Sequence, residues 1–312
     1  HKHLAFVAFA AGLVHSFSHS MMKSLLFMSA GAVMHATGTK NIELLGALGK
    51  KMPWTAAWTL IGCMSLASLP FTSGFIGEWL TLQSLISLAG TASTQGLRFL
   101  VLAAFIFLGL TGALALGCFV RYFGVAFLGR RRSGVVLNAH EQTISMRIGM
   151  AMEAVMIVLL GVSPAALVNG AQRVLTGGIG YPKANDFGVF WPGFGNDLAF
   201  YSPLFLLFLT VILLTVLIIP LLEKGIFAKR DITWNCGTVP TRRQQYTATG
   251  FSKPLRRAFS FILCPQRERV YLTREHDYFG RRLEYHLSIP EHFERLLYQP
   301  VEHFLVKMAN QK

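Results

Sequence analysis

The stretch from Leu4 to His35 reads LAFVAFAAGLVHSFSHSMMKSLLFMSAGAVMH. A helix needs about 20 apolar residues to cross the core of a bilayer, and this stretch is longer than that. The ionisable side chains of His15, His19 and Lys23 interrupt it at intervals of four residues. Four residues make about one helical turn, so these side chains share one side of the helix. The stretch therefore predicts a membrane-spanning helix with an ionisable stripe.

The composition of the whole chain also indicates a membrane protein. Only 14% of its residues are charged and 53% are hydrophobic, whereas soluble domains carry about 25% charged residues. We predict an all-α fold, a polytopic transmembrane helix bundle in residues 1–222 followed by a basic tail in residues 223–312. Besides the first stretch, the expected spans are Trp54–Leu88, Leu97–Leu128, Met146–Val168 and Ser202–Leu222.

The second expected span is too long for one simple helix and contains the sequence SLPFTSGF (Ser68–Phe75). Pro70 has no backbone N–H to donate, and Gly74 tolerates unusual backbone angles. We therefore predict that this span is a discontinuous helix, broken at Pro70 to Gly74. Broken helices at membrane depth occur inside protein or beside water, and in transporters they mark ion and substrate sites.

Basic residues in the loops predict the orientation of the chain. Lys40, Lys50 and Lys51 follow the first span, Arg130–Arg132 follow the third, and the tail is strongly basic. Because cytoplasmic loops carry an excess of Lys and Arg, these loops and the C-terminus are expected to face the cytoplasm. A basic tail is also compatible with nucleic-acid binding, but no nucleic-acid motif accompanies it. Anionic lipid is the simpler partner.

The tail is expected to end in an amphipathic helix from about Pro290 to Met308. Ser288–Glu291 (SIPE) has the pattern of a capping box, and Pro300 predicts a kink. The apolar face would rest on lipid or on a partner subunit. Its residues are Phe293, Leu296, Leu297, Val301, Phe304, Leu305 and Met308.

Lysine inside an apolar span costs about 2.5–3.5 kcal/mol, so Lys23 is expected to be buried against a cavity or a polar partner. Snorkelling of Lys23 to the headgroups is disfavoured by its depth in the span. A proton relay needs groups that exchange protons near neutral pH, and histidine does so unperturbed. Each histidine alone could instead be an ordinary core residue.

Two acidic residues in the apolar spans are further candidates for proton transfer. Glu78 follows the expected helix break, and Glu153 lies in the fourth span. Burial shifts the titration of a carboxylate toward neutral pH. Glu78 could instead form a structural ion pair with a nearby Lys or Arg. For Glu153 the closeness of Arg147 gives a structural role equal weight.

The four cysteines are far apart and form no CxxC pair. Neither a disulfide framework nor a metal site is expected from them, and no cofactor is expected in this chain.

The segment His15–Ala56 (HSFSHSMMKSLLFMSAGAVMHATGTKNIELLGALGKKMPWTA), followed by Ser68–Trp79 (SLPFTSGFIGEW), resembles the antiporter-like subunits of respiratory complex I and its relatives. The resemblance implies that the lysine of the first motif, here Lys23, is the central proton carrier. It implies that His15 and His19 form the relay to it. It also implies that Glu78, at a position where some members have lysine, ends the relay.

The tail segment Thr233–Phe259 (TWNCGTVPTRRQQYTATGFSKPLRRAF) is similar to the branch that includes hydrogenase-4 component B and formate hydrogenlyase subunit 3. The upstream half of that family and the membrane anchor that follows the tail in many members have no counterpart here. Because the sequence also begins without methionine, it is expected to be a fragment.

The resemblance implies a non-catalytic, proton-translocating subunit of a membrane-bound, formate-hydrogenlyase-type hydrogenase in the bacterial inner membrane. Its partners would be other membrane subunits and, indirectly, soluble subunits with NiFe and iron–sulfur centres. The chain could instead be a subunit of complex I or of a multisubunit cation/proton antiporter. It could also be a structural scaffold with an inactive channel, or the partner of an inorganic-carbon uptake module.

Overall fold

The computed structural model describes residues 2–179, 244–272, 282–292 and 294–310, with isolated positions at 208, 211–212, 215, 236–238 and 241. The chain forms two compact units, His1–Ala248 and Thr249–Lys312, and each is treated separately below. The expected boundary after residue 222 and most of the expected span Ser202–Leu222 lie outside the described residues.

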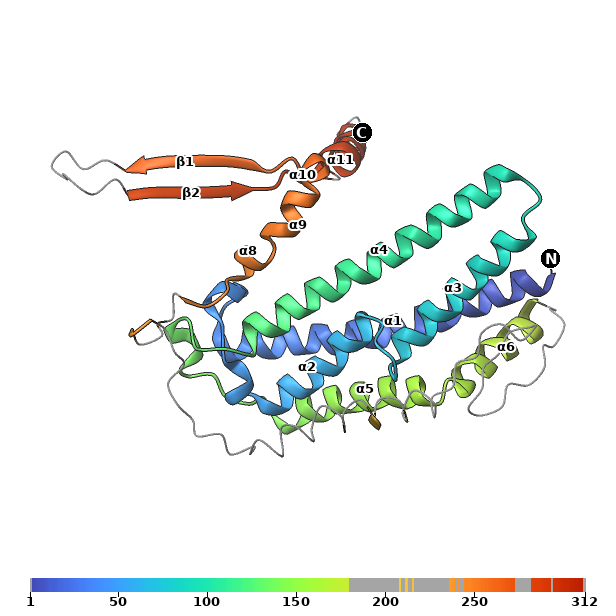
Figure 1. Ribbon diagram of the computed structural model, residues 1–312, viewed down its shortest axis with the longest axis horizontal. Helices are drawn as coiled ribbons and strands as arrows, with labels where there is room; N and C mark the ends of the chain where they lie inside the picture. Colours follow the sequence, from blue (N-terminus) through green and yellow to red (C-terminus); the bar gives the residue numbers. More distant parts are fainter. Residues whose placement is uncertain are drawn as a thin grey trace. The chain divides into compact units, whose positions relative to one another are not determined.

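The first unit is a helix bundle, as the sequence predicted. In Figure 1, α2 and α3 return in series along the length of α1, α4 runs back, and α5 and α6 again follow one another in series. By length and hydropathy alone, α4 and α5 could each cross a membrane. The helices are α1 (Lys2–Thr37), α2 (Pro53–Leu66), α3 (Ser73–Thr91), α4 (Gln95–Ala126), α5 (Ile144–Val162) and α6 (Ala165–Ile179).

The ends of these helices follow from local sequence. Gly38, with φ +69°, ends α1 and donates its N–H to the carbonyl of Met34 at 2.8 Å. This is the left-handed C-terminal geometry that glycine favours. Pro53 begins α2, where its missing N–H has no helical partner to lose. The Thr94 side chain accepts the N–H of Leu97 at the start of α4.

The second expected span is interrupted between α2 and α3. The chain is not helical from Ala67 to Thr72, a segment that contains Pro70, and helix resumes at Ser73, so Gly74 lies in the first turn of α3. Ser68 and Phe71 adopt positive φ angles of 52° and 70°. Such angles are strained for residues with a side chain, so the surrounding packing must maintain them.

The fourth expected span, Met146–Val168, is not one helix either. α5 ends at Val162, and α6 begins after Ser163 and Pro164. The sequence analysis did not predict this second break, although Pro164 lacks the N–H that a continuous helix requires. The two breaks touch, because a Cβ on Gly161 would collide with the carbonyl of Phe71.

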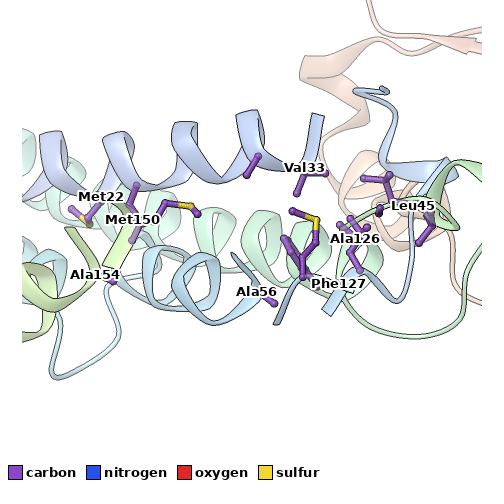
Figure 2. Packing of buried hydrophobic residues seen from close by; sticks show 14 of the residues in the cluster. Met22, Val33, Leu45, Ala56, Ala126, Phe127, Met150 and Ala154 are labelled. Atoms are coloured by element: carbon purple, nitrogen blue, oxygen red, sulfur yellow. The ribbon is translucent and has the colours of Figure 1, made fainter. Parts of the chain in front are cut away.

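The interior of the first unit is organised around α1. One buried cluster joins the C-terminal half of α1 to α2, α5 and the end of α4, through residues such as Met22, Met150 and Phe127 (Figure 2). A second cluster joins the N-terminal half of α1 to α3 and α6, through Val14, Ile76 and Val168 among others. The two interrupted spans, α2–α3 and α5–α6, are called the broken pairs. In each broken pair the first helix packs in the first cluster and the second helix packs in the second cluster.

The second unit contains a β-hairpin that the sequence analysis did not predict. Strands β1 (Gln266–Leu272) and β2 (Arg282–Ser288) pair antiparallel, with Gln266 opposite Ser288. The hairpin lies beside short helices α8 (Ala248–Phe251), α9 (Lys253–Ala258) and α10 (Ser260–Leu263) in the sequence. The all-α prediction thus holds for the bundle, and the tail adds two strands.

The end of the tail is helical, and its start differs from the prediction. Ser288 ends strand β2, so Ser288–Glu291 is not a capping box at a helix start. A π-helical turn, Glu294–Tyr298, directly precedes α11 (Gln299–Ala309), and Pro300 occupies the first turn of α11. Leu296, Leu297, Val301, Phe304, Leu305 and Met308 are all exposed, and Phe293 is outside the described residues.

The close packing at the first break predicts that Gly74 cannot carry a side chain. A Cβ there would collide with the carbonyl of Ser65 and lie 2.8 Å from Met22 Sδ. Gly74→Ala is expected to destabilise the bundle by about 1–3 kcal/mol through overpacking, seen as a lower Tm in detergent. Gly31→Ala is the matched control, because no atom lies within 4 Å of its added Cβ. An unchanged Tm for Gly74→Ala would contradict the described packing.

Candidate functional site

The ionisable stripe of α1 is present in the structure. The rings of His15 and His19 stack with centroids 5.9 Å apart and planes 19° from parallel. Both side chains are half-buried, whereas the side chain of Lys23, one turn further along, is exposed. The two histidines thus form a pair one turn apart on the same face, as helical spacing requires.

His15 lies where α1 and α3 approach most closely. A Cβ added to Gly77 of α3 would come within 2.8 Å of both the Cα and the Nδ1 of His15. Only glycine therefore permits this approach. It brings His15 of α1 against Gly77, which directly precedes Glu78.

Polar atoms without protein partners lie in the facing segments of α1 and α3. Among the described residues, His15 Nδ1, Ser18 Oγ and Ser73 Oγ are buried and accept or donate no hydrogen bond. Buried polar atoms in folded proteins are nearly always bonded to protein or to ordered water. These segments consequently have the chemistry to bind water between the histidines and the helix break.

Glu78 is half-buried on α3 and faces α4. Its Oε1 would lie 3.2 Å from a Cβ added to Gly112 of α4. The absence of a side chain at Gly112 gives the carboxylate room between the two helices. No ion pair of Glu78 is recorded among the described residues.

Glu153 extends from α5 toward α1. Ser24 Oγ donates a hydrogen bond to its Oε1 at 3.3 Å. Its Oε2 is buried and has no protein partner in the described part of the chain. Among the described residues the recorded partner of Glu153 is therefore Ser24, the residue next to Lys23, and not Arg147, whose proximity in sequence had given a structural role equal weight.

The transmembrane family described as "NADH:quinone oxidoreductase/Mrp antiporter, TM" matches residues 3–106, which include the stripe of α1 and the first helix break. Two curated proteins of Escherichia coli are 32% identical to the chain. They are hydrogenase-4 component B, over 83% of this chain, and formate hydrogenlyase subunit 3, over 81%. The chain belongs to the antiporter-like membrane subunits of this family.

The antiporter-like subunit spans only 39% and 40% of the length of those two relatives. Its fold is shared with a chain of the archaeal membrane-bound sulfane sulfur reductase, at a TM-score of 0.69 and 21% identity. That match covers 97% of this chain and 43% of the other. The fold of nearly the whole antiporter-like subunit thus matches part of a known membrane complex.

The Lys23 side chain is exposed, whereas the sequence predicted that it would be buried. It lies on the face of α1 that also carries Ser16, Ser20 and Phe27, all exposed, whereas α2, α3, α5 and α6 cover the other sides of the helix. No described element of the antiporter-like subunit covers this face. The depth of Lys23 in the span was predicted from sequence, but depth alone does not determine which neighbours cover a side chain.

Several residues of the site were missed by sequence reasoning. Gly77 and Gly112 were not singled out, because glycine in an apolar helix carries no sign of the helix that will approach it. Ser18 and Ser73 gave a weak signal as hydroxyls within apolar segments. Among the described residues no group of three His, Cys, Asp or Glu side chains is arranged to hold a metal ion.

The contact at Gly77 predicts that the packing of α1 against α3 depends on this glycine. Gly77→Ala places a methyl group against His15 and is expected to displace the histidine from the α3 interface. The Tm of the protein in detergent should fall. Gly109→Ala on α4, where the added Cβ meets no atom within 4 Å, should leave the Tm unchanged. Equal Tm values for the two variants would show that the close approach at Gly77 does not contribute to the packing.

Proposed function

We propose that the antiporter-like subunit translocates protons through a relay formed by His15, His19, Lys23 and Glu78. The relay would be driven by redox chemistry in partner subunits of a membrane-bound NiFe hydrogenase complex of the formate-hydrogenlyase type. Glu153 is a further member of the proposed path.

The observation that carries this proposal is the interface between α1 and α3. It combines a stacked histidine pair, a glycine contact that brings His15 against α3, and buried polar atoms with no hydrogen-bond partner among the described residues, where ordered water could bind. Protons move between titratable side chains through such water. The helix break next to this interface is typical of ion-transport sites in membrane proteins.

The exposed face of α1 supports the proposal that other membrane subunits or regions complete the path. A lysine in contact with lipid at membrane depth costs several kcal/mol. The face with Ser16, Ser20 and Lys23 is therefore expected to lie against protein in the assembled complex. Such a neighbour would give Lys23 the polar partner that the sequence predicted for it.

The hydrogenase assignment rests on the names of the two similar Escherichia coli proteins. The orientation rests on the basic loops: the segments that contain Lys50 and Arg130 are joined at one end of the bundle, through the hydrogen bond from Ala47 N to Leu128 O. A single basic end favours a cytoplasmic location for that end and for the tail. Identification of the subunits that copurify with the chain tests the assignment directly.

Lys23→Ala is expected to abolish coupled proton movement while the complex still assembles, because it removes the central proton carrier of the proposed relay. The measurement is acidification of inverted membrane vesicles during hydrogen turnover. Lys40→Ala removes an exposed lysine from the loop that follows α1 and is the control. Proton movement at the wild-type rate in Lys23→Ala would refute the relay and favour a structural scaffold.

Glu78→Gln is expected to preserve assembly and to remove most proton movement, because glutamine keeps the shape of the side chain but cannot carry a proton as glutamate does. Glu78→Lys should retain some activity, since the resembling family uses lysine at this position. Both are compared with Glu43→Gln, which changes a loop carboxylate paired with Arg132. Unchanged transport in Glu78→Gln would assign this residue to structure alone.

A further inference from the structure

A pocket of about 750 Å³ opens at the end of the bundle where the loops are basic. Its described lining contains four cationic side chains, Lys50, Lys51, Arg130 and Arg131, and no acidic one. Two of these residues follow α1 and two follow α4, so the fold brings together charges that are far apart in the sequence. Ala47, Gly129 and Thr241 complete the described wall.

The pocket is built from fixed backbone and is not a loose group of surface side chains. Ala47 N donates to Leu128 O at 2.8 Å, and Gly49 N donates to Phe127 O at 2.9 Å. A third segment is joined to these loops, because Arg130 N donates to Gln245 Oε1 at 2.7 Å. Gly129, with φ +73°, makes the turn between them. The spacing of the cationic groups is thus set by hydrogen bonds between three segments.

Two carboxylates near the pocket have recorded partners outside its described lining. Glu43 forms an ion pair with Arg132 at 3.5 Å. Glu141 accepts the N–H groups of Trp54 and Thr55 at 2.9 and 3.3 Å, at the start of α2. Neither residue belongs to the described lining. Like charges that lie close together repel one another, and a bound anion reduces that repulsion.

The position of the pocket indicates the source of the anion. It lies between the end of α4 and the start of α2, at the basic end of the bundle, and such ends are expected at the cytoplasmic surface of a membrane. Two large apolar side chains at this end of the bundle are exposed: Leu128 is 55% exposed and Trp54 is 54% exposed. Tryptophan is typical of the headgroup level of membranes. A ligand with an anionic head and apolar chains satisfies both parts of this surface.

We propose that this pocket binds the phosphate headgroup of an anionic phospholipid. The headgroup would lie among Lys50, Lys51, Arg130 and Arg131, and its acyl chains would extend along the exposed apolar residues of the same end. Basic pockets between transmembrane helices are known to select such lipids. The proposal does not depend on the proton relay, because it uses none of the relay residues.

In the test, the detergent-solubilised complex is titrated with phosphatidylglycerol, which is anionic. A parallel titration uses phosphatidylcholine, which has no net charge, as the comparison lipid. Bound lipid is counted by native mass spectrometry for wild type, Lys50→Gln and the double variant Lys50→Gln/Arg131→Gln. Lys40→Gln removes a basic charge from the same loop region, but Lys40 is not among the described lining residues, and it serves as the control. A parallel series adds inorganic phosphate as a competitor.

We expect phosphatidylglycerol to bind more tightly than phosphatidylcholine. Each lost charge near a membrane surface corresponds to about a fivefold loss of affinity. Lys50→Gln should therefore bind about fivefold more weakly and the double variant about 25-fold more weakly, while Lys40→Gln stays at the wild-type value. A Tm measured for each variant without lipid verifies that it is folded.

Three results would overturn the proposal. Equal weakening in Lys40→Gln would mean that lipid is attracted by the basic surface as a whole. Displacement of the lipid by millimolar inorganic phosphate would make free phosphate the ligand. A crosslink from Lys50 to an acidic segment of another subunit, in complex that retains no anionic lipid, would show that protein occupies the pocket.

Discussion

The contact of α1 with the two broken helix pairs determines the rest of the bundle. α1 packs against α2 and α5 along its C-terminal half and against α3 and α6 along its N-terminal half. Glycines stand at close contacts within the first break and between the two breaks. Gly74 lies against the carbonyl of Ser65, and Gly161 lies against the carbonyl of Phe71. A side chain at either position would separate helices that now share both buried clusters.

The same packing retains polar groups that reduce stability. An unsatisfied buried polar group costs about 1–3 kcal/mol, and apolar residues in place of His15, Ser18 and Ser73 could fill the same space without that cost. The positive φ angles of Ser68 and Phe71 add backbone strain in the adjacent break. Unpaired buried polar atoms and strained backbone angles that occur close together are expected at functional sites. Here they gather on the interface that the family resemblance had assigned to proton transfer.

The sequence predicted the helix bundle and the interruption at Pro70, because apolar length, proline and glycine are local signals. It did not predict the interruption at Pro164: that proline is the same kind of local signal, but the apolar run continues on both sides of it. The β-hairpin of the tail was also missed: its strands are charged and short. The site residues with ionisable side chains were found from helical spacing. Their neighbours Gly77 and Gly112 were not, because the approach of one helix to another depends on contacts far apart in the sequence.

The positions of the two carboxylates give the proposed relay an order along α1. Glu153 is bonded to Ser24, next to Lys23, whereas Glu78 follows the residue that contacts His15. Residues 15 and 24 are roughly 14 Å apart along a helix axis, so the carboxylates lie at different depths. The stacked histidines occupy the interval between them. In the proposed relay, a proton at the level of Glu153 and Lys23 would therefore pass His19 and then His15 on its way to the level of Glu78. The stripe of α1 thus extends from the level of the carboxylate on α5 to the level of the carboxylate on α3.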